Sequence, residues 1–353
     1  MTILFAILLF SLLIFVHELG HFVAAKLSGV QVNEFSMFMG PAIVKWQRGE
    51  TLYAIRTIPI GGYCAMEGED VDTDNPRSFQ KAAWWKRLII LVAGAAMNFL
   101  TGLLIYSILF VPAKQVKIPE IVSFTECCIF DSADGLQVGD EILRIDGEKI
   151  LVSGDVGTLL SINPTGVHDI EVRRGEEVLR FQDLKMGHTH TDENGEIYRH
   201  YGFSYGRAVD ASIKDNLVYV WKAARDDVRM VRLSLQMLIR GDAGLKDMTG
   251  PLGMVQFMSD AAAASKTVMD AVENLLSIGA FIAINLAVMN LLPIPALDGG
   301  RVVGLLLTTG IEAVTHKKID SKYEGYIHGV GMILLLVLMA VVFFKDVFVI
   351  FKG

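Results

Sequence analysis

A histidine and glutamate motif lies at the end of an uninterrupted apolar segment near the start of the sequence. Residues 3–16 contain a single polar residue, Ser11, and no charge. His17, Glu18 and His21 follow directly, in the pattern H-E-x-x-H. An apolar segment of this kind predicts a membrane-spanning helix, where ionisable side chains are costly and are retained for a function. The motif therefore predicts a membrane protein with chemistry at membrane depth.

The spacing of the two histidines suits a metal ion. On a helix, His17 and His21 lie one turn apart on the same face, so two imidazoles can bind one ion. Glu18 lies on an adjacent face, from which it can take a proton from a metal-bound water. The same motif arises by chance in soluble helices. Chance explains the motif poorly here, because burying three ionisable side chains in lipid costs free energy that no function would offset.

Three further segments are apolar over the length of about 20 residues that a bilayer requires. With 52% hydrophobic residues, the chain of 353 residues is too apolar for an ordinary soluble enzyme. The first segment lacks the basic start and the cleavage site of a signal peptide. We therefore expect a polytopic α-helical membrane protein whose four spans cover approximately residues 2–27, 88–111, 272–292 and 328–350.

Lysine and arginine residues are concentrated in two of the loops. Residues 28–87 end in Lys86 and Arg87, next to the second span, and the loop between the third and fourth spans holds Arg301, Lys317, Lys318 and Lys322. No basic residue precedes the first span. Because basic loops stay on the cytoplasmic side, both termini and residues 112–270 are expected outside the cytoplasm.

Residues 30–63 change to the composition of a β-hairpin. A turn at Gln47–Glu50 precedes a second strand, and the section ends in the sequence Ile58-Pro59-Ile60-Gly61-Gly62-Tyr63. Such a hairpin can be purely structural. We favour contact with a substrate, because an exposed strand edge beside a catalytic metal site can pair with an extended peptide. The acidic residues 67–74 that follow are expected to be solvated and without special chemistry.

Residues 119–207 have the composition of a soluble α/β module that follows a linker at 112–118. The run G-L-x-x-G-D-x-I-L-x-I-D-G occupies residues 135–147, a short helix is expected over 155–162, and a hairpin turns at Arg174-Gly175. The module resembles a PDZ domain, which implies binding of an extended peptide or chain terminus at a sheet edge, although scaffolding is an alternative. Residues 208–267 include an amphipathic helix, 216–240, expected on the outer membrane surface.

The third span ends in a sequence that cannot continue a helix. Two prolines and two glycines surround Asp298 within residues 293–300, at membrane depth. Irregular backbone there is tolerated where it is buried in protein or lines a cavity. Asp298 is therefore the natural third ligand of a His₂Asp zinc site whose fourth position holds water. In the second span, Asn98 is expected to make an interhelical hydrogen bond rather than to act in catalysis.

Together, the H-E-x-x-H motif, the run from Asn290 to Gly299 and the PDZ-like module resemble the site-2 protease family of intramembrane metalloproteases, and within it the bacterial RseP-like group. The resemblance covers nearly the whole chain. It implies that His17, His21 and Asp298 bind Zn²⁺, that Glu18 is the general base and that Asn290 lies by the substrate. It also implies that the hairpin ending in residues 58–63 is a membrane re-entrant β-loop that pairs with the substrate.

The same resemblance implies substrates and a location. The expected substrates are single-span membrane proteins already trimmed on the outer side, such as anti-sigma factors, with signal-peptide remnants as a further class. The location would be the bacterial cytoplasmic membrane, with the active site towards the cytoplasm. Two departures from the family pattern are visible: Ala95 replaces the proline of a G-P-x-x-N-F motif, and only one PDZ-like domain is present.

The expected domains are residues 1–111 with the first two spans and the β-loop, the linker 112–118, the PDZ-like domain 119–207, the membrane-surface region 208–267, and residues 268–353 with the last two spans. The net charge of −7 argues against a nucleic-acid partner. The three cysteines form no disulfide framework, and no role is assigned to Cys127 and Cys128. A membrane scaffold with structural zinc and a metal transporter are the alternatives. A general base such as Glu18 has no use in a structural site, and the fourth span shows none of the polar residues of an ion path between Gly329 and Phe344.

Overall fold

The chain consists of two compact units. A computed structural model describes residues 2–69, 73–124, 135–163, 165–186, 188–191, 197–244, 248–316 and 322–352. One unit comprises Met1–Tyr106 with Asp227–Gly353, and the other comprises Ser107–Asp226. Cys127 and Cys128 lie outside the described residues.

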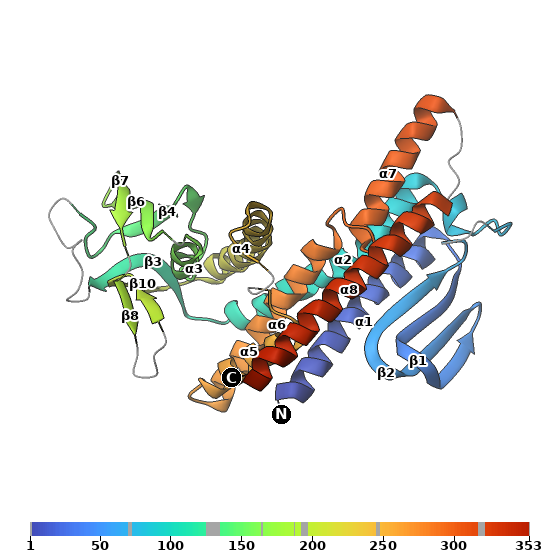
Figure 1. The fold of residues 1–353 in the computed structure, drawn as a ribbon, viewed down its shortest axis with the longest axis horizontal. Helices are drawn as coiled ribbons and strands as arrows, with labels where there is room; N and C mark the ends of the chain where they lie inside the picture. The colour runs from blue at the N-terminus through green and yellow to red at the C-terminus, as the bar shows by residue number, and fades with distance from the viewer. Residues whose placement is uncertain are drawn as a thin grey trace. The chain divides into compact units, whose positions relative to one another are not determined.

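The first unit is mainly helical (Figure 1). Within the described residues, four helices are long and apolar enough to cross a membrane, over Ile3–Ser28, Trp84–Phe110, Val268–Asn290 and Gly325–Phe348. These candidate segments coincide with the four predicted spans. The helices of this unit are α1 (Thr2–Ser28), α2 (Trp84–Phe110), α5 (Pro251–Ala263), α6 (Val268–Asn290), α7 (Asp298–Thr315) and α8 (Lys322–Lys352), with the second half of α4 (Ile213–Arg240) and a short 3₁₀ turn, η1 (Phe79–Lys81).

Two of these helices were not predicted. The sequence around Gly250 predicts a break before the third span, but α5 begins at Pro251 within that break. Proline suits the first position of a helix because it needs no hydrogen-bonded N–H there. Helix α7 begins at Asp298, in the stretch expected to be a loop between two spans. The amphipathic helix predicted for residues 216–240 is present as α4, which starts slightly earlier.

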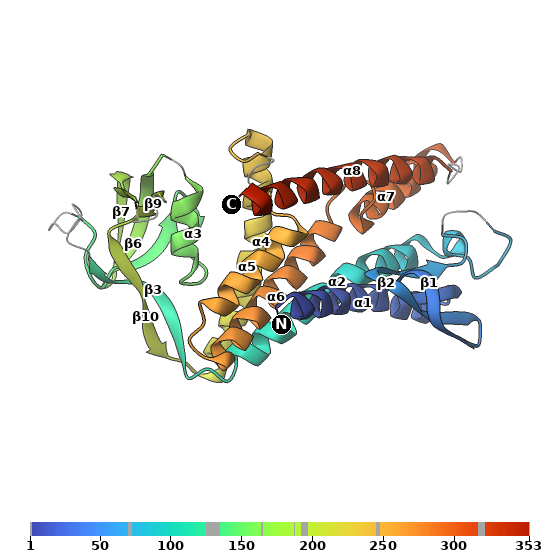
Figure 2. The same cartoon turned by 60° about the horizontal axis from the view of Figure 1, so that its bottom comes forward.

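Strands β1 (Val32–Arg48) and β2 (Thr51–Met66) form the predicted hairpin, with its turn at Gly49. Both strands bend so far that residues 34–37 pair with 62–65 on one side and with 52–55 on the other. Residues 44–48 in turn pair with 51–55. The hairpin is thus a curled sheet of four segments, with residues 62–66 at one edge. It lies alongside α1 (Figure 1, Figure 2).

The hairpin and three helices share one apolar core. Its buried residues are Ala24, Ala25, Val30, Val32, Phe35, Cys64, Met66, Phe79, Ile90, Leu91 and Leu305. Helices α1 and α2 approach closely, because a Cβ atom on Gly20 would lie 2.4 Å from the carbonyl oxygen of Ala93. Packing of this kind, through small residues, is what holds helices together where lipid removes the hydrophobic driving force. It fixes α2 beside the H-E-x-x-H motif.

The second unit is built on an antiparallel sheet in the order β10-β3-β4-β6-β7, with β5 paired to β4. Its elements are β3 (Gln115–Phe124), β4 (Glu141–Ile145), β5 (Glu148–Lys149), α3 (Asp155–Ile162), β6 (Val167–Arg174), β7 (Glu177–Lys185), β10 (Phe203–Asp210) and a separate pair, β8 (His188–Thr191) and β9 (Ile197–His200). The short helix and the hairpin at Arg174-Gly175 occur where the sequence predicts them. Strand β3 begins inside the predicted linker, because β10 pairs with it from Gln115 onward.

Candidate metal centre

Three side chains from the two ends of the chain converge in the first unit. His17 and His21 lie on α1, and Asp298 is the first residue of α7. The Oδ2 atom of Asp298 lies 3.2 Å from Nε2 of His17 and 3.3 Å from Nε2 of His21. The two Nε2 atoms are 3.1 Å apart. The structure therefore brings together all three residues that the sequence predicts as metal ligands.

The hydrogen bonds around His17, His21 and Asp298 leave acceptor atoms of these side chains facing one another. Nδ1 of His21 lies 2.8 Å from the carbonyl oxygen of Ile90 and donates to it, so Nε2 of a neutral His21 carries a lone pair. Oδ2 of Asp298 is buried and accepts no hydrogen bond among the described residues. Such a cluster of acceptors repels itself unless a cation lies among them. Two imidazoles and a carboxylate are ligands that suit a catalytic zinc ion, so the residues present fit the metal.

Gly94 of α2, which has no side chain, lies level with the two histidines. A Cβ atom on Gly94 would lie 2.4 Å from Nε2 of His21 and 2.7 Å from Cε1 of His17. Any larger residue would therefore push into the ligands. This glycine begins the stretch in which the family's proline is replaced by Ala95, and the close approach of the helices is kept without the proline.

Two asparagines from different helices face the far nitrogen of His17. Nδ2 of Asn290, at the end of α6, lies 3.4 Å from Nδ1 of His17, and Nδ2 of Asn98, on α2, lies 3.5 Å from the same atom. Asn98 is buried. Its contact is interhelical, as predicted, but it is made to a ligand residue. Outer partners of this kind fix the orientation and tautomer of metal-binding histidines.

The backbone before Asp298 explains the glycines of this region. A Cβ atom on Gly299 would lie 2.2 Å from the carbonyl oxygen of Leu292, and one on Gly300 would lie 2.4 Å from that of Ile294. The turn that leaves α6 thus packs directly on the first turn of α7. Ala296 within this turn has a φ of 86°, which an L-residue rarely adopts. The carboxylate of Asp298 is placed by a tight and strained connection.

A cavity of about 490 Å³ opens beside the three ligand residues. Glu18 and Asn290 line it together with part of β2. Gly62 of β2 comes especially close, because a Cβ atom there would lie 3.3 Å from Cγ of Glu18. The cavity therefore joins the candidate general base, the ligands and the edge segment of the hairpin.

The six residues 58–63 predicted to contact substrate are not equivalent. Gly62 and Tyr63 line the cavity, whereas Ile58 and Gly61 lie outside its lining. Pro59 and Ile60 belong to β2, but their side chains lie outside the described part of the structure. The lining instead continues along β2 through residues 64–66.

Sequence reasoning missed three polar residues of the cavity wall. Glu69, Arg301 and His328 line it, and Arg301 forms an ion pair with Glu69. The expectation of a solvated acidic stretch at 67–74 is therefore wrong for Glu69, which a partner distant in sequence holds at the cavity. Arg301 lies three residues after Asp298. This short separation is the one feature of the sequence that indicates that Arg301 lies at the cavity.

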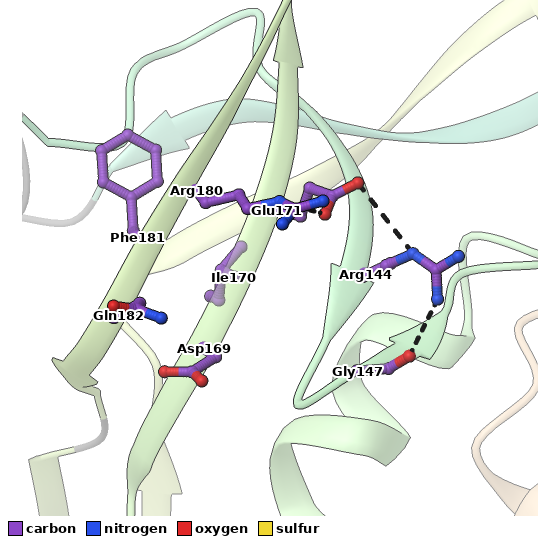
Figure 3. A pocket seen from close by; sticks show the side chains of 8 residues that line it. All are labelled: Arg144, Gly147, Asp169, Ile170, Glu171, Arg180, Phe181 and Gln182. Atoms are coloured by element: carbon purple, nitrogen blue, oxygen red, sulfur yellow. Dashed lines mark hydrogen bonds and ion pairs between the residues drawn. The ribbon is translucent and has the colours of Figure 1, made fainter.

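A second hollow lies in the second unit (Figure 3). It has a volume of about 390 Å³, is open, and is lined mainly by charged and polar residues. Glu171 of β6 stands between two arginines there, with its carboxylate 2.8 Å from Nε of Arg180 and 3.9 Å from Nε of Arg144 (Figure 3). Arg144 also donates to the carbonyl oxygen of Gly147 at 3.0 Å, and a second carboxylate, Asp169, lines the same hollow, which gives no indication of a ligand.

The comparisons with known proteins agree with this geometry. The model of the family described as peptidase family M50 matches residues 5–338. A predicted zinc metalloprotease of Clostridium perfringens is 35% identical over 98% of this chain and 98% of its own length. One of Clostridium acetobutylicum is 32% identical, covering 98% and 97%. The regulator of sigma-W protease RasP of Bacillus subtilis is 26% identical, covering 98% of each chain.

These matches confirm the predicted family and enzyme class, and zinc is the metal that the relatives' names give. The family match spans both ends of the metal centre, including the H-E-x-x-H motif and Asp298. The chain belongs to peptidase family M50.

Proposed function

We propose that this chain is an intramembrane zinc metalloprotease that hydrolyses a peptide bond within or near the transmembrane segment of single-span membrane proteins. The observation that carries the proposal is the convergence of His17, His21 and Asp298 beside Glu18, on a helix apolar enough to span a membrane. A structural zinc site would fill its coordination sphere with protein ligands. Here three ligand residues face a cavity that leaves room for water and a peptide.

The residues have separate roles. His17, His21 and Asp298 hold the metal, which when bound lowers the pKa of water and polarises a carbonyl group. Glu18 accepts a proton from the attacking water and passes it to the leaving nitrogen. Asn290 holds the imidazole of His17 from the substrate side of the cavity. This division gives both proton transfers to one carboxylate.

The edge of the curled hairpin supplies a place for the substrate. The amides of a transmembrane helix are bonded internally, so a peptide bond becomes accessible only when the helix is opened. Residues 62–66 lie at the edge of the hairpin sheet and line the cavity. A substrate that adds to this edge as a further strand exchanges its helical hydrogen bonds for interstrand ones. Gly62 and Tyr63 then contact the peptide closest to Glu18.

The substrates we propose are membrane proteins with one span, already trimmed on the outer side, such as anti-sigma factors. The similarity to a regulator of sigma-W protease supports this class, with signal-peptide remnants as a second one. The protein would lie in the bacterial cytoplasmic membrane with basic loops inside, both termini outside and the active site towards the cytoplasm. The second unit, whose sequence resembles a PDZ domain, would bind an extended peptide or terminus outside the cytoplasm.

Cleavage of a single-span substrate by the purified protein tests the proposal. The variant Glu18→Gln removes the general base and leaves the ligands in place, so cleavage should fall by at least about 100-fold while zinc content is kept. Glu273→Gln makes the same chemical change at an exposed position on α6 and should cleave like the wild type.

The outcome for zinc separates the proposal from its alternatives. If the wild type holds zinc but neither protein cleaves a panel of trimmed substrates, a scaffold with structural zinc explains the site better. If Glu18→Gln cleaves as fast as the wild type, Glu18 is not the general base and the assignment of the active site fails.

A further inference from the structure

The cavity wall facing the metal ligands carries a charged pair that the proposed reaction does not use. Glu69 follows β2, and Arg301 lies in the first turn of α7. Their side chains form an ion pair and are only 18% and 23% exposed. Removal of one partner from a pair so shielded from water destabilises the folded protein, because the remaining charge is poorly solvated.

One carboxylate of this pair makes contacts on two sides. The Oε1 atom of Glu69 binds Arg301, and its Oε2 atom accepts from the backbone N–H of Met66 at 3.4 Å. Met66 is the last residue of β2 and of the edge segment that lines the cavity. Glu69 therefore ties the end of the edge strand to the first turn of α7.

Arg301 is connected to Asp298 in two ways, through the first turn of α7 and through the turn that precedes Asp298. Arg301 lies three residues after Asp298, in the same helical turn. Nδ1 of His328 on α8 accepts from the N–H of Ala296 at 3.1 Å, so Nε2 of the neutral ring carries the proton and makes only a van der Waals contact with Nε of Arg301, at 3.3 Å. Ala296 is the residue with positive φ, two positions before Asp298. Its unfavourable conformation is thus held by a side chain that also contacts Arg301.

We infer that Glu69 and Arg301, with His328 behind them, are positioning residues that link the substrate-binding edge of the hairpin to the metal ligand Asp298. They act through Asp298 and through the end of β2, and they need not touch the scissile bond. The inference rests on the proposed function, since it presumes that Asp298 binds zinc. The inference implies that displacement of the β2 edge alters the metal site. It also implies that loss of the Glu69–Arg301 ion pair weakens zinc binding.

Zinc affinity measured by competition with a chromogenic chelator is the direct test. The full-length variants Glu69→Gln and Arg301→Gln should each bind zinc about tenfold more weakly, as loss of outer partners does at other metal sites. Glu69→Gln/Arg301→Gln should be no weaker than the weaker single variant, because both changes break one tie. Glu34→Gln, which alters an ion pair with Arg56 within the hairpin and outside the cavity wall, is the matched control and should bind like the wild type.

Two further measurements separate positioning from a general loss of structure. The visible spectrum of the Co²⁺-substituted protein should differ between Glu69→Gln and the wild type. Asp346→Ala, which removes a buried carboxylate of the same unit outside the cavity wall, should keep the wild-type spectrum although it also lowers stability. Arg301→Lys keeps a cation opposite Glu69 and should restore most of the affinity that Arg301→Gln loses.

Equal zinc affinity and equal cobalt spectra in the wild type and both single variants would overturn the inference. Additive losses in the double variant would also overturn it, because the two residues would then act independently. If the wild type itself binds no zinc, the proposed function fails before the inference is tested.

Discussion

Gly94 of α2 stands so close to His21 of α1 that a Cβ atom on the glycine would lie 2.4 Å from Nε2 of the histidine. The ligand face of α1 is therefore pressed against bare backbone of the neighbouring helix. Small residues at helix contacts commonly serve packing alone. This one also leaves the histidine nitrogen in place for a metal.

The variant Gly94→Ala should lose zinc. Its methyl group would occupy the space of the histidine nitrogens, so His17 and His21 must turn away or the helices must separate. We expect zinc affinity and cleavage both to fall by at least about tenfold, as measured by chelator competition and substrate cleavage. Gly310→Ala in α7 adds the same methyl group where nothing lies within 4 Å, and it should leave both quantities unchanged.

Asn98 should matter through the chemistry of its side chain. Its Oδ1 atom is buried without a hydrogen-bond partner among the described residues, and its amide lies 3.5 Å from Nδ1 of His17. A half-turn of the amide would let Oδ1 accept from Nδ1–H and leave Nε2 free for the metal. Asn98→Ala should therefore weaken zinc binding about tenfold, whereas Asn98→Asp, which also accepts this hydrogen bond, should retain it. Equal zinc affinity of the alanine variant and the wild type would exclude this role.

Asp346 should stabilise the first unit. This buried carboxylate on α8 accepts from the N–H of Gly253 at 2.9 Å and faces that of Gly250 at 3.4 Å, at the start of α5. Asp346→Ala would leave these amides without their acceptor and should reduce the free energy of unfolding by about 2 kcal/mol. Thermal unfolding in detergent measures the change. Asp260→Ala, at an exposed position of α5, should have a much smaller effect.

The G-D pair of the PDZ-like motif should act in folding. Asp140 is fully buried and receives hydrogen bonds from Nε and Nη2 of Arg174, both at 2.8 Å. The same hydrogen bonds raise the pKa of the Arg174 guanidinium above its ordinary value. Arg174→Ala leaves a buried carboxylate without its counter-charge and should destabilise the second unit by about 3 kcal/mol.

Limited proteolysis of the second unit measures that loss. Arg180→Ala removes an arginine that is 76% exposed and paired with Glu171, so it should cost less than about 1 kcal/mol. Equal protease resistance of the Arg174→Ala and Arg180→Ala variants would contradict the prediction.

The candidate metal ligands could be predicted from the sequence because each stands where its chemistry is costly. Histidines and a carboxylate at membrane depth indicate a function, and the spacing within the two motifs suits metal binding. Their closeness in space could not be derived from periodicity. It depended on the expectation that both motifs serve one ion, and the structure brings their side chains together.

Residues that act through tertiary contacts gave no such signal. Glu69 lies in an acidic stretch that resembles a solvated loop, and its partner Arg301 is 232 residues away. Nothing in the alternation of β1 and β2 indicates that residues 34–37 pair on both sides. The sequence predicts a loop over the start of α7 because two prolines precede Asp298 and two glycines follow it. The irregular backbone in fact ends at Asp298, and both glycines lie in the first turn of the helix.

The metal centre takes its ligands from the first helix and from a turn that follows the third candidate span. A growing chain that has inserted His17 and His21 therefore holds only part of a zinc site until synthesis has passed Asp298. On the proposed function, a copy that ends before Asp298 lacks one of the three ligands and should not cleave its neighbours or itself. The order of the candidate ligands along the chain would thus delay activity until the chain is nearly complete.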